Sequence, residues 1–221
     1  MKENLTEVVF IVDMSGSMQP FTQDTIGGYN NLLKDQKKVK GEANITTVFF
    51  DSEYILVHDR VNIKKVKPIT EKEYYPRGMT ALLDAVGKTI RDIGKKLADM
   101  NEADRPSQVI VTIITDGYEN ASKEYTWKQI QDMIKEQREK YNWLFTFLGA
   151  NIDVKKVSED LGVDSRLAKE YSASTAGTNS VYCTMSAAVS AFRKNSSKLQ
   201  DTADRESVMD EISMKMDENI K

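Results

Sequence analysis

The chain is poor in the residues that form disulfides and transition-metal sites. It has one cysteine, Cys183, and one histidine, His58, among 221 residues. A single cysteine cannot form an internal disulfide, which fits a reducing compartment such as the cytoplasm. The apolar residues around Cys183 predict that it lies on a buried helix face. Because His58 has no second histidine or cysteine nearby in the sequence, we expect neither a zinc-type centre nor a histidine-based triad.

Long apolar runs and an excess of basic charge are also missing. No segment approaches the roughly 20 apolar residues that span a bilayer, and residues 1–7 lack the apolar core of a signal peptide. The formal net charge is −3, from 31 basic and 34 acidic residues mixed along the chain. A nucleic-acid-binding protein more often has a basic face. We therefore expect a cytoplasmic protein that binds neither nucleic acid nor membrane; its oligomeric state is left open.

Short apolar runs alternate with helical patterns along the chain. Strands are predicted over about 7–12, 45–50, 54–58, 109–115 and 143–148, with a last short strand near Tyr171. Helices are predicted over about 22–38, 81–100, 127–141, 154–161 and 179–193. Only three residues separate the second and third strands, so these two form a hairpin. The alternation predicts an α/β fold: a Rossmann-like, doubly wound, mostly parallel sheet with helices on both faces.

The most informative segment follows the first strand. Asp13, Ser15 and Ser17 alternate with other residues, and alternate side chains point the same way in extended backbone. One carboxylate and two hydroxyls that converge at the carboxyl end of a buried strand suit a hard divalent cation. Two adjacent glycines, Gly27 and Gly28, interrupt the helix that follows, and close packing against this loop is one explanation for them.

Two later segments add further oxygen donors. Thr80 lies in the loop 77–82 that opens a helical pattern, and Asp116 follows the strand 109–115. Taken singly, an Asp-x-Ser is usually a cap and an Asp-Gly is usually a turn. If Asp13 and Asp116 face each other at about 4 Å, they repel by about 4 kcal/mol at an effective dielectric constant of 20. A cation or a raised pKa must relieve that repulsion.

In this order, Asp-x-Ser-x-Ser, Gly-x-Thr-x-Leu and Thr-Asp-Gly resemble the metal-ion-dependent adhesion site (MIDAS) of von Willebrand factor A (VWA) domains. Segments 25–30 and 115–120 are similar to those of compact single-domain bacterial and phage members. The resemblance implies a VWA domain over residues 1–195 with one antiparallel edge strand. It also implies a complete metal site, made of Asp13, Ser15, Ser17, Thr80 and Asp116.

The resemblance further implies what this site does. It would hold Mg²⁺, with Mn²⁺ or Ca²⁺ as alternatives, and would capture an Asp or Glu side chain of a partner protein through that ion. No catalytic residue and no organic cofactor are implied. Residues 196–221 carry apolar residues at intervals of four and predict an amphipathic helical tail. This tail either packs on its own domain or binds a partner.

A second hypothesis is a metal-dependent hydrolase or phosphotransferase that uses the same site. Such an enzyme needs a nucleophile or base within reach of the ion. A phosphoryl-accepting Asp13 would be better served by a carboxylate two residues later, where Ser15 stands. Asp51 and Glu119 are expected near the rim as ordinary solvated acids. We therefore predict a binding module, with the enzyme as the alternative and a scaffold that works by bulk contacts as a third hypothesis.

Overall fold

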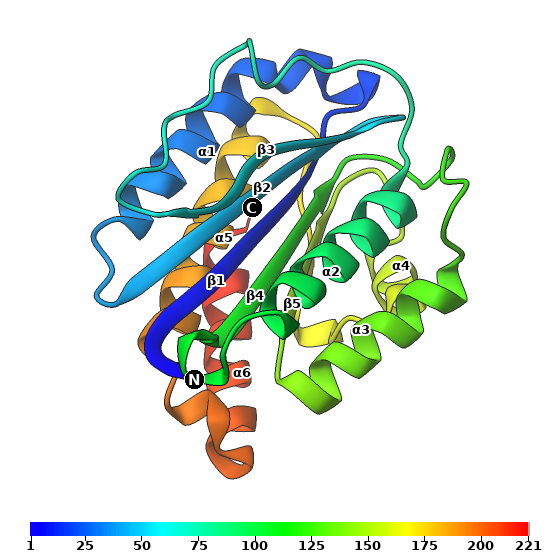
Figure 1. The fold of residues 1–221 in the computed structure, drawn as a ribbon. Coiled ribbons are helices and arrows are strands. Elements are labelled where there is room, and N and C mark those ends of the chain that lie inside the picture. The colour runs from blue at the N-terminus through cyan, green and yellow to red at the C-terminus, as the bar shows by residue number, and fades with distance from the viewer. Residues whose placement is uncertain (221) are drawn as a thin grey trace.

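A six-stranded sheet forms the centre of the computed structural model, which describes residues 1–220 (Figure 1). The strands lie in the order β3-β2-β1-β4-β5-β6, and all neighbours are parallel except the antiparallel pair β2–β3. The predicted α/β fold with one antiparallel edge strand is therefore confirmed. The strands are β1 (Lys2–Asp13), β2 (Glu42–Phe50), β3 (Tyr54–Asn62), β4 (Pro106–Thr115), β5 (Leu144–Gly149) and β6 (Ala168–Glu170).

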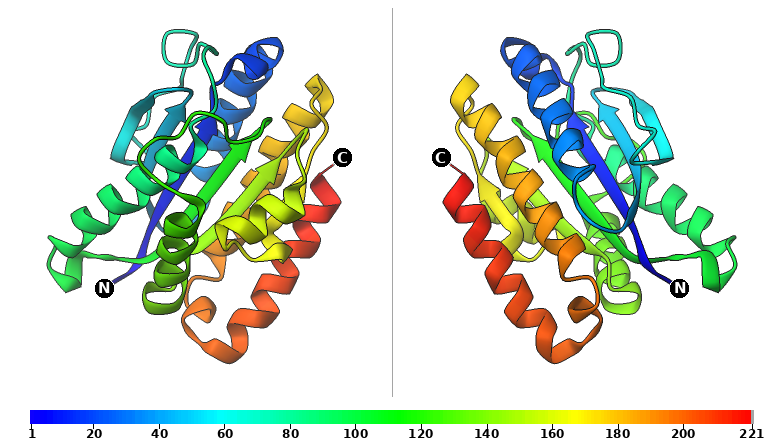
Figure 2. Two further views of the ribbon diagram at one scale, coloured as in Figure 1. Left: turned by 90° about the vertical axis from the view of Figure 1, so that its right-hand side faces the viewer. Right: turned by 90° about the vertical axis from the view of Figure 1, so that its left-hand side faces the viewer.

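Helices cover both faces of this sheet. Figure 2 shows α1, α5 and α6 on one face and α2, α3 and α4 on the other. Among residues 1–220, no helix is long and apolar enough to cross a membrane. The helices are α1 (Thr22–Gln36), α2 (Leu82–Ala98), α3 (Trp127–Tyr141), α4 (Val154–Leu161), α5 (Thr175–Lys194) and α6 (Thr202–Asn219).

The apolar run of β1 explains its central position. Val8 and Phe10 enter the core shared with α1, α5 and α6, whereas Val9 and Ile11 enter the core shared with α2, α3 and α4. A strand that is buried on both faces has a continuous apolar sequence, because neither face is exposed to solvent. The parallel register pairs Val12 of β1 with Ile114 of β4, so the carboxyl ends of the two strands lie side by side.

The tail after residue 195 ends in a helix that packs on the rest of the chain. Val208, Met209, Ile212 and Met216 of α6 are buried in the same core as the apolar residues of α1 and α5. Its regularly spaced apolar residues are therefore already covered within the chain. The division of the chain at residue 195 stays a prediction.

Two expectations about α5 and its neighbour α1 are corrected by the structure. Cys183 is exposed, because the buried face of α5 runs through Tyr182 and Met185. A Cβ added to Gly28 would lie 2.5 Å from the ring of Tyr182, whereas one added to Gly27 would meet nothing within 4 Å. The close packing at Gly28 is therefore against α5 and not against the loop after β1.

Candidate metal centre

The carboxyl ends of β1 and β4 place two carboxylates at one edge of the sheet. Asp13 is the last residue of β1, Asp116 follows β4, and both are buried. Asp13 Oδ1 accepts the backbone N–H of Ser15 at 2.7 Å, and Oδ2 accepts the hydroxyl of Thr115 at 2.6 Å. The turn after β1 and the last residue of β4 thus hold this carboxylate from both sides.

The two serine hydroxyls connect the first loop to the second carboxylate. Ser15 Oγ lies 3.1 Å from Ser17 Oγ, and the Ser17 hydroxyl donates to Asp116 Oδ1 at 2.5 Å. Ser15 is buried and Ser17 is exposed, so the cluster opens to solvent on the Ser17 side. The structure therefore brings these three residues into direct contact.

Thr80 reaches the same place from the loop before α2. A Cβ added to Gly117 would lie 3.7 Å from Thr80 Oγ1 and 3.9 Å from Ser17 Oγ, so both hydroxyls flank one small space beside Asp116. The Thr80 N–H donates to Asn120 Oδ1 at 2.9 Å, and the Asn120 N–H donates to the Thr80 carbonyl at 3.0 Å. Within the described residues, the Thr80 hydroxyl makes no hydrogen bond. Its lone pairs are thus available to a ligand.

Burial makes both carboxylates expensive to ionise. Loss of hydration raises the pKa of Asp13 from 3.8 to about 6, against the opposing effect of the hydrogen bonds from Thr115 and Ser15. The charge of Asp116 adds a smaller upward contribution to the pKa of Asp13. Burial likewise raises the pKa of Asp116. A cation in this space would favour the ionised form of both groups.

The donor set fits a hard dication. It consists of two carboxylates and three hydroxyls, and oxygen donors are what Mg²⁺, Mn²⁺ and Ca²⁺ prefer. Among residues 1–220, no group of three or more His, Cys, Asp or Glu side chains is placed to hold a metal. Carboxylate-rich calcium cages and thiolate or imidazole centres differ from this arrangement. All five predicted residues lie at this edge of the sheet, and their role as metal ligands stays a prediction.

Three residues that support the centre are not among the five predicted ligands. Thr115 hydrogen-bonds Asp13, Asn120 is paired with Thr80, and the Tyr74 hydroxyl donates to the Asp13 carbonyl at 2.8 Å. The position of Thr115 directly before Asp116 was a usable signal. Asn120 lies in the segment 115–120 that resembles the family, but its contact with Thr80 was not predicted, and Tyr74 carries no local signal because its partner is distant in the chain.

The two acids expected as solvated rim groups are held by the protein. Asp51 is buried and accepts from the Arg77 guanidinium at 3.0 Å and from the Glu53 N–H at 2.6 Å. Glu119 accepts from the backbone N–H of Leu83 and, in its own loop, from those of Ala121 and Ser122. Both carboxylates therefore brace loops, and the expectation that they are solvated was wrong.

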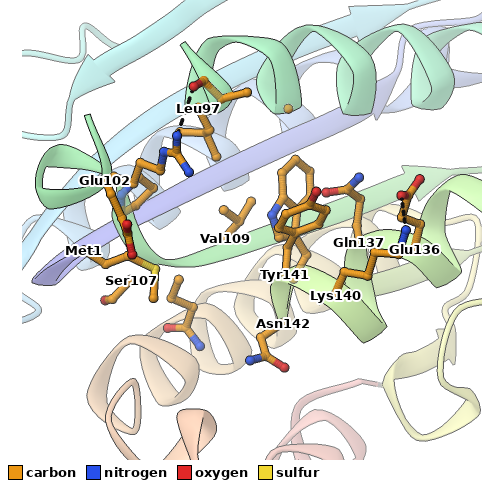
Figure 3. Close-up of a pocket in the computed structure, with 16 residues that line it drawn as sticks. Met1, Leu97, Glu102, Ser107, Val109, Glu136, Gln137, Lys140, Tyr141 and Asn142 are labelled. Carbon is orange, nitrogen blue, oxygen red and sulfur yellow. Dashed lines mark hydrogen bonds and ion pairs between the residues drawn. The ribbon is translucent and has the colours of Figure 1, made fainter. Parts of the chain in front are cut away.

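A separate hollow lies at the opposite edge of the sheet. It has a volume of about 460 Å³ and is lined by Leu97, Val109 and Tyr141, among others. Figure 3 shows this pocket, with the ion pair of Glu136 and Lys140 on its rim. None of the five predicted ligands lines it, so this hollow and the oxygen cluster are separate places. The oxygen cluster is the chemically specific one.

The fold and the oxygen cluster define a class: an α/β domain with polar loops gathered at the carboxyl end of a mostly parallel sheet. Solved structures with this fold include a von Willebrand factor type A protein from Catenulispora acidiphila. The identity is 13% and the TM-score 0.55, over 84% of this chain and 43% of that one. The chain therefore has the VWA fold.

Two further solved structures with this fold are described as holding metal. Manganese-loaded TRAP protein of Plasmodium vivax is 16% identical, with a TM-score of 0.56 over 78% of this chain and 70% of that one. Mussel byssus proximal thread matrix protein 1, with a zinc-occupied MIDAS motif, is 15% identical. Its TM-score is 0.57 over 82% of this chain and 44% of that one. The chain spans less than half the length of the mussel and Catenulispora proteins. Comparison with protein-family models and with curated proteins gives no match.

Proposed function

We propose that this protein is a metal-dependent protein-binding module of the compact bacterial or phage VWA type. Asp13, Ser15, Ser17, Thr80 and Asp116 hold a divalent ion, Mg²⁺ in the first instance, with Mn²⁺ or Ca²⁺ as alternatives. The bound ion supplies an electrophilic coordination position that accepts an oxygen of a partner's Asp or Glu. The metal-loaded states of the mussel and Plasmodium proteins support a divalent ion on this fold.

The observation that carries the proposal is the Thr80 hydroxyl. It flanks the same small space as Ser17 and makes no hydrogen bond within residues 1–220. Other buried threonine hydroxyls, such as that of Thr184, also lack a protein partner, so the support comes from the place of the Thr80 hydroxyl beside Ser17 and Asp116. Asn120 accepts from the Thr80 N–H and donates to the Thr80 carbonyl, and these two hydrogen bonds fix the backbone that carries the hydroxyl.

The surroundings of the centre favour binding over hydrolysis. A hydrolase needs a base that is free to take a proton from water or substrate. Glu119 and Asp51 are already occupied by backbone and guanidinium donors. His58 lies on the edge strand β3, where its Nδ1 is 3.1 Å from Thr47 Oγ1. We therefore assign the site to recognition and not to turnover.

Metal titration tests the proposal directly. We expect Mg²⁺ or Mn²⁺ to bind the EDTA-treated protein in calorimetry and to raise its melting temperature as mass action requires. Asp13→Ala should abolish both effects, whereas Asp99→Ala, at an exposed position at the end of α2, should leave both intact. Thr80→Ala should weaken capture of partner proteins more than it weakens folding.

Three results would overturn this assignment. The first is a melting temperature that does not respond to any of the three ions. The second is metal-dependent turnover of a phosphatase, nuclease or peptidase substrate that is lost in Asp13→Ala, which would make the protein an enzyme. Recovery of the same partners by wild type and Asp13→Ala would show that the ion is not the recognition element.

A further inference from the structure

Exposed apolar side chains gather around the candidate metal centre. Tyr75, Met79 and Tyr118 are 39%, 56% and 55% exposed. Met79 directly precedes Thr80, Tyr118 comes two residues after Asp116, and the Tyr75 N–H lies 3.2 Å from the sulfur of Met14, the residue after Asp13. Single exposed apolar residues are normal on a protein surface, whereas a group around one point marks an interaction site. We call these three residues the apolar rim.

The two tyrosines of the rim are held in place in the free protein. The Tyr118 hydroxyl accepts the backbone N–H of Asp153 at 2.9 Å, which ties the loop after β4 to the start of α4. The ring of Tyr75 lies under the guanidinium of Arg77, whose central carbon is 5.2 Å from the ring centroid. Aromatic groups held in this way lose little freedom when a partner covers them, which is typical of the residues that dominate interfaces.

The cation beside Tyr75 is already neutralised within the protein. The Arg77 guanidinium is paired with Asp51 at 3.0 Å and with Glu53 at 2.7 Å. A second acidic side chain of the partner that approached Tyr75 would meet the exposed Glu53 and an Arg77 that is already paired. On the Tyr75 side, the surface therefore favours an apolar neighbour of the captured acid over a second acid.

We propose, on the basis of the function proposed above, that the apolar rim selects partners whose captured acid is flanked by large apolar residues. The rim lies on two sides of the centre, with Met79 and Tyr75 on the side of the Thr80 loop and Tyr118 on the side of β4. In an extended segment, residues two apart point the same way and lie about 7 Å from each other. The partner motif is therefore an exposed apolar-x-Asp/Glu-x-apolar segment.

Two labelled heptapeptides test the motif. One carries leucine two residues before and two residues after a central aspartate, and the other carries serine at those positions; glycine fills the rest. Fluorescence anisotropy with Mg²⁺ should show the leucine peptide binding about tenfold or more tightly than the serine peptide, and EDTA should abolish binding of both. Met79→Ala and Tyr118→Ala should each weaken binding of the leucine peptide roughly five- to tenfold.

The chain offers matched controls for these variants. Tyr141 and Met214 are each 61% exposed and lie away from the centre, on α3 and α6. Tyr141→Ala and Met214→Ala should bind both peptides as wild type does. All four variants should keep the full rise in melting temperature with Mg²⁺, because none removes a proposed ligand.

The outcomes separate this inference from the function on which it rests. Suppose that Mg²⁺ stabilises the protein but the two peptides bind equally, or neither binds. That result would overturn the proposed selection by the apolar rim and would leave the proposed metal site unaffected. Equal losses in the rim and control variants would also overturn it. Absence of any response to metal would instead overturn the proposed function.

Discussion

Replacement of Asp13 by asparagine should stabilise the metal-free protein. The side chains have the same shape, and both hydrogen bonds of Asp13 can be kept. The amide oxygen accepts from Ser15 in place of the carboxylate, and the amide N–H₂ donates to Thr115 Oγ1. The Thr115 hydroxyl then donates to the Gly117 carbonyl, which already lies 3.0 Å away. What Asp13→Asn removes is therefore the buried charge alone.

The pKa of Asp13 sets the size of the effect. Burial raises this pKa from 3.8 to about 6, and one pKa unit corresponds to about 1.36 kcal/mol. The folded protein thus holds a proton that the unfolded chain releases between about pH 4 and pH 6, so its free energy of unfolding falls as pH rises through this range. Above pH 6 the loss levels off at no more than about 3 kcal/mol, which asparagine avoids.

Urea unfolding in EDTA between pH 4 and pH 8 measures this difference. The two proteins should be about equally stable at pH 4, and Asp13→Asn should become more stable by up to about 3 kcal/mol at pH 8. For a chain of this length, that corresponds to a melting temperature about 6–12 °C higher. Mg²⁺ should reduce this difference in stability between the variant and wild type. An ion at 100 times its Kd stabilises wild type by about 2.7 kcal/mol and should stabilise the asparagine variant by less.

Asp99→Asn is the matched control, since Asp99 is exposed at the end of α2. Its stability should stay within about 0.5 kcal/mol of wild type at every pH. A pH-independent difference between Asp13→Asn and wild type, or a variant less stable than wild type in EDTA at pH 8, would refute the reasoning. Either result would mean that the carboxylate is not a desolvated charge in the folded, metal-free protein.

Three further predictions test the scaffold. Asn120→Ala should lower the free energy of unfolding in denaturant by about 1 kcal/mol and should lower Mg²⁺ affinity several-fold in calorimetry. Unchanged affinity would show that the Asn120 side chain does not position Thr80. Gly28→Ala should lower stability by about 1–3 kcal/mol, because the added methyl group overpacks against Tyr182 of α5. Gly27→Ala should raise stability by up to about 1 kcal/mol through helix propensity. Equal melting temperatures of the two variants would contradict the close packing of Gly28 against Tyr182. Ile212→Ala should cost about 2–5 kcal/mol because Ile212 is buried in the core, and the exposed Met214→Ala should cost less than about 0.5 kcal/mol.

Local signals were enough to predict some elements to the residue. The prediction of α3 over 127–141 is confirmed, because both of its ends are encoded nearby in the chain. Thr126 forms a capping box with Gln129, and Asn142 ends the helix in the left-handed conformation at φ 56°. β1 is longer than predicted and begins at Lys2, which pairs with Pro106 of β4. That extension depends on a distant strand and leaves no local pattern.

The sequence by itself determined the α/β fold and the order of the oxygen-bearing residues, because both follow from the periodicity and spacing of residues that are close together in the chain. Buried strands end in Asp13 and just before Asp116, and parallel strands bring their carboxyl ends to one edge. Only the tertiary structure decided which groups brace that edge. Asn120 reaches Thr80 and Glu119 reaches Leu83 across about 40 residues of chain. Such contacts are set by how loops fold over one another, and no periodicity records them.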